Sequence, residues 1–318
     1  MAQLTRIRKD FLSILDFEPA DFDRCLDVAA QLKADRPLGR EAPSADVLAG
    51  RHVAMLFEKA SLRTRSTFEI AIHELGGHVL VLRPDAALGG REPVADVARN
   101  LERWIDAVII RTFSQQLLKE FAAAAKRLHV INALTDDEHP CQALSDFLTL
   151  REYWGSPRGR TIAYVGDGNN VAASLAQAAA MVGAHFHVAS PDGYQLRDSV
   201  VHQATGVACH GARLRLFTDP ADAVAGADAI YTDTWTSMGQ EDEAVVRRRI
   251  FAPYQVNEGL MALAKPGVLF LHCLPAHRGE EVTTEVFESP ASIVFDQAEN
   301  RLHCQKALLM MLLAPASA

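Results

Sequence analysis

Residues 155–159 read Gly155-Ser156-Pro157-Arg158-Gly159, and they separate two halves of the chain that share one internal pattern. Two glycines and a proline within five residues are typical of a loop between structured segments. On both sides, short apolar runs alternate with segments of helical period, which indicates parallel strands covered by helices. We therefore expect an α/β fold with two doubly wound parallel-sheet domains and an active-site cleft between them.

The alternation places the elements as follows. In the first half, strands are predicted at 53–57, 78–82, 107–110 and 130–133, and helices at 63–75, 94–104, 115–128 and 140–154. In the second half, strands are predicted at 161–165, 186–189, 214–217, 229–232 and 268–271, with a helix at 170–182. A last helix at 297–313 is apolar on one face and is expected to pack back on the first domain. The predicted domains are thus 1–140 with 297–318, and 141–296.

Composition limits the classes of function. The 318 residues carry a net charge of −8, which disfavours nucleic-acid binding because that requires a basic surface. The five cysteines form no Cys-x-x-Cys pair, which favours a reduced, cytoplasmic protein without disulfides or a zinc ribbon. We find neither a secretory signal nor an apolar run of membrane-spanning length, so no membrane association is expected.

The segment Ser61-Leu62-Arg63-Thr64-Arg65 lies between a predicted strand and a predicted helix. The first turn of a helix offers unpaired N–H groups and a positive dipole, which together bind anions. Two hydroxyls and the planar guanidinium of Arg63 suit a phosphate group. The alternative is that Ser61 only caps the helix and the arginines are solvated.

Further polar side chains follow other strands of the first half. Arg111 ends the strand 107–110, at the edge of the sheet where parallel sheets bind ligands. His139 and Gln142 stand three residues apart around a predicted helix start at Pro140, and both can donate to a carbonyl oxygen. The alternative is a capped helix with an incidental histidine.

In the second half, Gly166-Asp167-Gly168 forms a predicted tight turn that places Asn169 or Asn170 at a helix start facing the cleft. This turn lacks the third glycine of a dinucleotide-binding fingerprint, so its nucleotide signal is weak. Asp233 follows the strand 229–232, where it can meet an ammonium group, and Gly239 permits an unusual turn shortly after it. A solvated loop is the alternative.

His272-Cys273-Leu274-Pro275 places a thiol where a buried strand ends, because proline cannot continue the ladder. Buried cysteines at such positions are often only packing residues. The sequence leaves open whether Cys273 packs, orients an amine or acts as a covalent nucleophile.

Taken in chain order, these motifs resemble the carbamoyltransferase family, and within it the ornithine enzymes. The order is Ser-x-Arg-Thr-Arg, a strand-end arginine, His-Pro-x-Gln, Gly-Asp-x-x-Asn, Asp-x-x-x-Ser-Met-Gly, His-Cys-Leu-Pro and Glu-Asn-Arg, and it covers almost the whole chain. The sets Ser237-Met238-Gly239 and His272-Cys273-Leu274-Pro275 are the specific ones. The resemblance implies transfer of a carbamoyl group from carbamoyl phosphate to L-ornithine, giving citrulline and phosphate in arginine biosynthesis.

The resemblance also implies the site residues. Those for carbamoyl phosphate are Ser61, Leu62, Arg63, Thr64, Arg111, His139, Gln142, Cys273, Leu274 and Arg301. Those for ornithine are Asn170, Asp233, Ser237 and Met238, and the catalytic set is Cys273, Asp233, Arg111 and His139. No metal or organic cofactor is implied. The family acts as a trimer or a multiple of trimers, with a neighbour's loop, near residues 84–91 here, closing each site.

Two departures bear on the substrate. Leu62 stands where ornithine enzymes commonly have threonine, and relatives that carbamoylate acylated ornithine often have leucine there; Ala86 and Ala87 occupy the loop near 84–91, where relatives often carry a polar residue. An acylated ornithine or another amine is therefore the alternative substrate. Two other hypotheses are an NAD-dependent dehydrogenase that uses Gly166 to Gly168, and a catalytically silent paralogue.

Overall fold

The computed structural model describes residues 8–88, 90–237, 239 and 241–314. The chain divides into two compact units, one formed by residues 1–148 with 299–318 and the other by residues 149–298. Both divisions fall inside helices, α6 (Pro140–Trp154) and α13 (Val294–Leu313). Each unit contains one all-parallel sheet with helices, as the alternating pattern predicted. Within the described residues, no helix is both long and apolar enough to cross a membrane.

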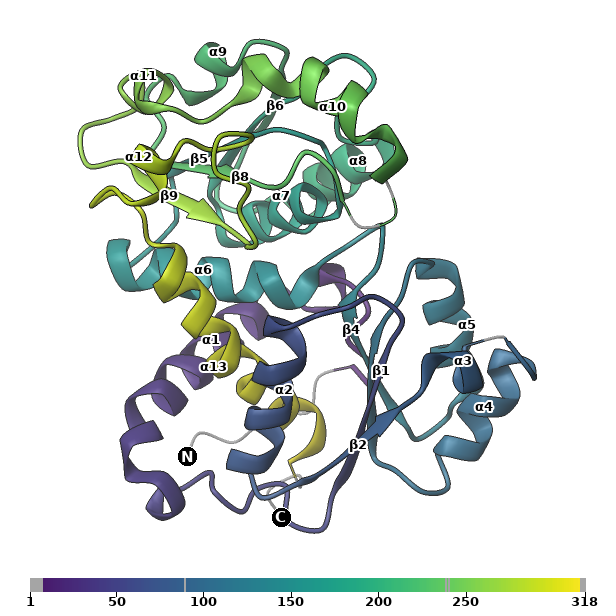
Figure 1. The fold of residues 1–318 in the computed structure, drawn as a ribbon. Helices are drawn as coiled ribbons and strands as arrows, with labels where there is room; N and C mark the ends of the chain where they lie inside the picture. The colour runs from purple at the N-terminus through teal and green to yellow at the C-terminus, as the bar shows by residue number, and fades with distance from the viewer. Residues whose placement is uncertain (1–7, 89, 238, 240, 315–318) are drawn as a thin grey trace. The chain divides into compact units, whose positions relative to one another are not determined.

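The first unit is built on a four-stranded sheet of order β2-β1-β3-β4. Its strands are β1 (His52–Phe57), β2 (His78–Leu82), β3 (Ala107–Arg111) and β4 (His129–Leu134). Its helices besides α6 and α13 are α1 (Pro19–Asp35), α2 (Arg63–Glu74), α3 (Pro84–Ala87), α4 (Val94–Leu101) and α5 (Gln115–Ala124), with 3₁₀ turns at Ile14–Asp16 and Arg36–Glu41. Within this unit α4 and α5 lie on one side of the sheet, and α1, α2 and α13 lie on the other (Figure 1).

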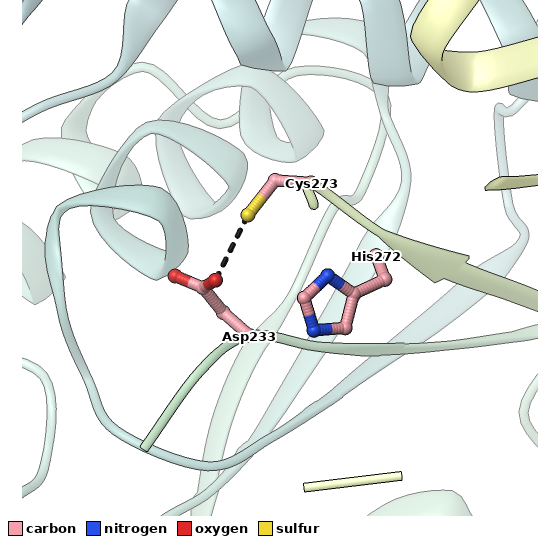
Figure 2. Close-up of side chains that lie close together, drawn as sticks. All are labelled: Asp233, His272 and Cys273. Atoms are coloured by element: carbon pink, nitrogen blue, oxygen red, sulfur yellow. Dashed lines mark hydrogen bonds between the residues drawn. The ribbon is translucent and has the colours of Figure 1, made fainter. Parts of the chain in front are cut away.

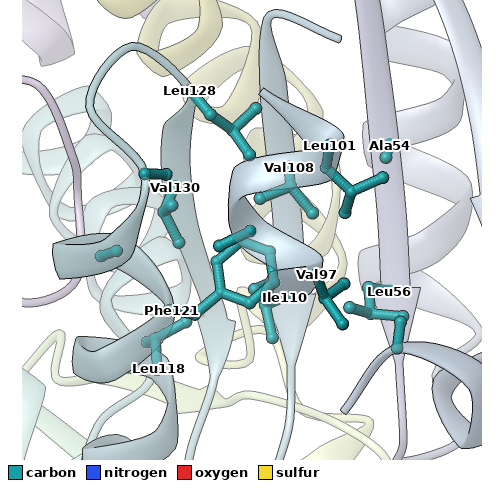
Figure 3. Packing of buried hydrophobic residues seen from close by; sticks show 14 of the residues in the cluster. Ala54, Leu56, Val97, Leu101, Val108, Ile110, Leu118, Phe121, Leu128 and Val130 are labelled. Atoms are coloured by element: carbon teal, nitrogen blue, oxygen red, sulfur yellow. The ribbon is translucent and has the colours of Figure 1, made fainter. Parts of the chain in front are cut away.

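Alternate residues of β1, β3 and β4 form one of the two packed faces of this sheet. Leu56, Val108 and Val130 point toward α4 and α5, where Leu101 and Phe121 meet them (Figure 3). Both faces of the sheet are covered at β4 as well, so this strand is buried at every position, and only His129 and Asn132 in it are polar. Burying a side chain such as Phe121 contributes about 1.5–3 kcal/mol.

The second unit is built on a five-stranded sheet of order β7-β6-β5-β8-β9. Its strands are β5 (Thr161–Val165), β6 (His185–Ala189), β7 (Leu214–Phe217), β8 (Ala229–Thr232) and β9 (Leu269–His272). Its helices are α7 (Asn170–Val182), α8 (Asp198–Gly206), α9 (Pro220–Val224), α10 (Ala244–Phe251), α11 (Glu258–Met261) and α12 (Thr284–Phe287), with 3₁₀ turns at Glu241–Glu243 and Ala252–Tyr254. Val165, Ile230 and Phe270 pack with residues of α9, α10 and α12 on one face.

Strand register decides which loops gather at one edge of each sheet. Val165 pairs with Thr232, and Thr232 pairs with His272, so three neighbouring strands end level with one another. In the first unit, Phe57 and Leu134 pair with Arg111 in the same way. The segments that follow these strands carry the motifs. They lie at the carboxyl ends of the strands, which form the edge where open parallel sheets bind ligands.

Two helices are shorter than the sequence predicts. The helix expected over 94–104 ends at Leu101. The helix expected over 115–128 ends at Ala124, because Ala125 turns to extended backbone (φ −90°, ψ 123°). The next two N–H groups, of Lys126 and Arg127, donate to the Glu102 carboxylate instead of to the helix. A distant side chain thus ends a helix that local propensity would continue.

Gly168 sits where the turn after β5 touches the segment before α8. A Cβ at this position would lie 2.3 Å from Leu196 N and 2.4 Å from Gln195 C, both backbone atoms. We expect Gly168→Ala to destabilise the protein by about 1–3 kcal/mol, as overpacking does. Gly206→Ala is the control, since a Cβ there meets no atom within 4 Å. Thermal unfolding of both variants checks this; an equal midpoint for the two would contradict it.

Candidate active site

In the first unit, the start of α2 and one residue of α13 come together. α2 begins at Arg63, and Leu62 rather than Ser61 occupies the N-cap position, without a side-chain cap. Thr64 is buried, and its Oγ1 accepts a hydrogen bond from Nη2 of Arg301, which is also buried. Residues 299–318 belong to the first unit, and Arg301 among them places a guanidinium beside the helix start that the sequence marks as an anion site.

His139 lies close to two cationic side chains, those of Arg301 and Arg111. It is buried where the segment after β4 leads into α6, and its pKa is held well below the usual value. Burial is the main cause, since it disfavours the charged form, and the charges of Arg301 and Arg111 add to it. The imidazole is therefore neutral at neutral pH, with one ring N–H to donate and one nitrogen to accept.

Gln142 offers an acceptor at the first turn of α6. Its side chain is buried, and its Nε2 donates to Asp146 Oδ1 at 2.8 Å. Its buried Oε1 has no hydrogen-bond partner among the residues that the structure describes. The sequence suggested a donor to a carbonyl oxygen; the contact with Asp146 instead makes Oε1 the atom left to satisfy, which an N–H group of a ligand can do.

The lowered pKa of His139 predicts a pH-dependent stability. Below pH about 6.5 the unfolded chain binds a proton at this histidine that the folded protein does not bind. Stability from this group is therefore complete above that pH and is lost as the pH falls, by at most about 1.4 kcal/mol per pH unit. As the pH is lowered from 7.5 to 5.5, we expect the unfolding midpoint of the wild type to fall relative to that of His139→Asn. Thermal unfolding of both proteins at a series of pH values measures this difference. Parallel curves would contradict it; His187 and His303, whose pKa values are also lowered, are present in both proteins and cancel.

In the second unit, Cys273 and Asp233 meet at the level ends of β9 and β8. The thiol donates to Asp233 Oδ1 at 2.9 Å, and Figure 2 shows the sulfur directed at the carboxylate. Both residues are buried. The backbone N–H of Thr234 donates to the same oxygen at 2.8 Å. A carboxylate held in place by several donors is suited to receive a cationic amine.

Asn169 completes this cluster and performs two tasks. Its Oδ1 caps α7 by accepting from the N–H groups of Val171 and Ala172. Its Nδ2 donates to Asp233 Oδ2 at 2.8 Å. The sequence left open whether Asn169 or Asn170 faces the cleft from the helix start. In the structure Asn169 binds Asp233, and Asn170 is the first residue of α7 and is half-buried.

The second unit also contains a buried cation that ties two loops together. Arg247 of α10 donates from Nε to the carbonyl oxygen of Trp235 at 2.5 Å and forms an ion pair with Asp167. Asp167 lies in the turn before Asn169, and Trp235 follows Asp233 by two residues. Neither motif contains Arg247, and no pattern in the sequence marks it. Arg247 therefore links the loop that follows β5 to the loop that follows β8.

The remaining predicted residues fall as follows. Ser61, Arg63 and Arg111 are half-buried in the first unit, and Leu62 is 74% exposed. Ser237 and Leu274 are half-buried in the second unit. Gly239 has φ 94°, in agreement with the unusual turn expected there. Met238 lies outside the described residues.

Among the residues that the structure describes, two groups of side chains have the composition of metal ligands. The ligand atoms of Asp233, His272 and Cys273 lie within 4.8 Å of one another, and so do those of His277, Glu280 and Glu281. In the first group both ring nitrogens of His272 already have protein partners, so a metal there would displace one of them. In the second group Glu280 pairs with Arg248 at 2.8 Å. Neither group therefore presents a ready coordination site.

Comparison with known proteins agrees with this arrangement. Residues 9–152 match the carbamoyl-P binding domain of aspartate/ornithine carbamoyltransferase, and residues 158–312 match the Asp/Orn binding domain. Proteins named ornithine carbamoyltransferase from Thermosynechococcus vestitus and Anoxybacillus flavithermus are 50% and 49% identical over 306 and 308 residues, which cover 96% of this chain and 96% of each relative. The structure of ornithine carbamoyltransferase from Pyrococcus furiosus matches with a TM-score of 0.93 at 44% identity and covers 100% of both chains. Both family domains match in order, and a relative is 50% identical over 96% of the chain. The chain therefore belongs to the aspartate/ornithine carbamoyltransferase family.

Proposed function

We propose that the protein transfers the carbamoyl group of carbamoyl phosphate to the side-chain amine of L-ornithine, giving L-citrulline and phosphate. The observation that carries the proposal is the buried pair of Cys273 and Asp233, with Asn169 on the second carboxylate oxygen. A buried carboxylate attracts an ammonium, and the thiol beside it can orient the amine once a proton is lost. The names and family models of the relatives support the same substrates.

On the phosphate side, we propose that Ser61, Leu62, Arg63 and Thr64 bind carbamoyl phosphate at the start of α2. Arg111 and Arg301 then offset the charge that builds on the phosphate and the carbonyl oxygen, since fixed donors act most strongly where charge develops. The neutral ring of His139 donates to the carbonyl oxygen, and Gln142 Oε1 accepts from the carbamoyl nitrogen. In this scheme residues 1–140 with 297–318 hold carbamoyl phosphate.

On the amine side, we propose that Asn170, Asp233, Ser237 and Met238 hold ornithine within residues 141–296, with Cys273 and Leu274 beside the reacting amine. A side-chain ammonium has a pKa of about 10.4, so it must lose a proton before it attacks the carbonyl carbon. Transfer requires that nitrogen to reach the carbamoyl carbon, so both sets of residues must act on one substrate pair. No metal or organic cofactor enters this scheme, and a homotrimer or a multiple of trimers working in the cytoplasm for arginine biosynthesis is part of the proposal.

The test is a product assay on purified protein with carbamoyl phosphate and a panel of amines: L-ornithine, N-acetylornithine, putrescine and L-lysine. We expect citrulline from ornithine as the main product and loss of turnover in Arg63→Ala, because the phosphate group loses its planar partner. Preference for N-acetylornithine would move the assignment to the acylated substrate that Leu62 leaves open. Wild-type turnover in Arg63→Ala would remove that residue from the scheme.

A further inference from the structure

The imidazole of His272 is held from both sides beside the proposed amine site. The side chains of His272 and Glu281 are both fully buried. The backbone N–H of Leu274 donates to His272 Nδ1 at 2.9 Å, and His272 Nε2 lies 3.2 Å from Glu281 Oε1. His272 is also fixed through its backbone, since its N–H donates to Gln297 Oε1 at 3.0 Å.

These contacts determine which ring nitrogen carries the proton. A nitrogen that accepts a backbone N–H cannot itself be protonated, so Nδ1 is bare. The ring proton therefore sits on Nε2 and is donated to Glu281. Without an acceptor at Glu281 the proton could move to Nδ1. There it would face the N–H of Leu274, and two donors cannot form a hydrogen bond with each other. The carboxylate thus selects the tautomer that the backbone needs.

That backbone is unusual. Leu274 has φ 61°, in the left-handed region that residues with a side chain rarely adopt. Its N–H is the group bound to His272, and the residue before it is Cys273, whose thiol points at Asp233. A loss of the ring contact would release the peptide that joins Cys273 to Leu274. Both residues would then lose their fixed orientation toward an amine.

We propose that Glu281 and His272 are positioning residues for carbamoyl transfer: Glu281 fixes the imidazole tautomer, and Nδ1 of that tautomer holds the Cys273–Leu274 peptide in its reactive geometry. Neither residue touches substrate in this scheme. The inference rests on the proposed function, because it concerns the orientation of the thiol and of Leu274 at the amine. It gives a role to Glu281, which lies in none of the motifs, and to His272, which lies in the His-Cys-Leu-Pro motif but had no role assigned from the sequence.

Two substitutions of His272 separate the ring contacts. In His272→Asn the amide oxygen takes the place of Nδ1 and keeps an acceptor for the N–H of Leu274, but the link to Glu281 is lost. In His272→Gln the amide nitrogen takes the place of Nε2 and keeps the link to Glu281, but the Leu274 acceptor is lost. We expect His272→Asn to keep a kcat close to wild type. We expect kcat of His272→Gln to fall by about 10²-fold, the loss that a displacement of about 1 Å produces at a reacting group.

A second pair tests the tautomer directly. Long-range ¹H–¹⁵N correlation spectra distinguish protonated from bare ring nitrogens, and they do not depend on turnover. We expect a bare Nδ1 in the wild type and in Glu281→Gln, whose amide oxygen still accepts from Nε2. In Glu281→Leu we expect a protonated Nδ1 and faster alkylation of Cys273 by iodoacetamide.

The outcomes are separable from failure of the proposed function. A protonated Nδ1 in the wild type would overturn the inference, and so would equal kcat values for His272→Asn and His272→Gln at equal thermal stability. If the wild type carbamoylates a different amine, the same comparison is made with that amine. If it carbamoylates none, the proposed function fails, and the spectra still decide whether Glu281 sets the tautomer. Should Glu281→Leu not fold, the two His272 variants carry the test alone.

Discussion

Asp233→Asn is expected to lower kcat/KM for ornithine by about 30- to 4,000-fold, because removing one partner of a buried charge pair costs about 2–5 kcal/mol. The asparagine oxygen can still accept from Cys273 and from the N–H of Thr234. Its amide nitrogen, however, must face Nδ2 of Asn169, which donates to this position in the wild type. Asn169 cannot rotate to help, since its oxygen caps α7. The KM for carbamoyl phosphate is expected to change far less.

Initial rates with each substrate varied in turn measure this effect. Asp222→Asn is the matched control, since it removes the same charge from an exposed position in the same unit and is expected to leave both KM values unchanged. A fall confined to carbamoyl phosphate would contradict the assignment of Asp233 to the amine. So would wild-type kinetics of Asp233→Asn with ornithine.

Arg301→Met is expected to lower kcat by about 10²–10³-fold, the usual loss when one donor aimed at developing charge is removed. Methionine retains much of the apolar stem, so the packing of α13 is largely kept. The contact with Thr64 disappears, and Thr64 is left buried without this donor. The loss should lie in kcat more than in KM for ornithine.

The same variant has a second, independent readout. The charge of Arg301 contributes to the lowered pKa of His139, so its removal should raise that pKa toward the usual value, while burial still holds it down. The protonation of His139, followed by NMR against pH, should therefore move to higher pH in Arg301→Met. Arg151→Met is a suitable control, as it removes a charge from a half-buried position of α6, whereas the charges that lower the pKa of His139 are those of Arg301 and Arg111. An unmoved His139 titration would show that Arg301 does not act on this ring.

Most strands were predictable from the sequence because they are short runs of mainly apolar residues. β4, β8 and β9 are buried at every position, and all of their residues are apolar except His129 and Asn132 in β4, Thr232 in β8 and His272 in β9. Helix α1 was not predicted, although Pro19 at its first position and the buried residues Phe22, Leu26 and Ala29 were signals for it.

The site was predictable only as far as strand ends reveal it. Cys273 and Asp233 each follow a buried strand, so their edge of the sheet could be inferred, but their contact depends on the register of β8 against β9. Asn169 and Asn170 are chemically identical, and only the capping geometry distinguishes them. Arg247 and Glu281 act across 80 and 9 residues through side chains that no periodic pattern marks.

The contact between Arg301 and Thr64 spans 237 residues and has a consequence for synthesis of the chain. Residues 299–318 belong to the same compact unit as residues 1–148, while the other unit lies wholly between them in sequence. Domains generally fold in the order in which the ribosome releases them. Here the unit that begins to emerge first needs a helix that follows the whole of the other unit, so the proposed phosphate-binding pocket can be completed only after that other unit has been synthesised.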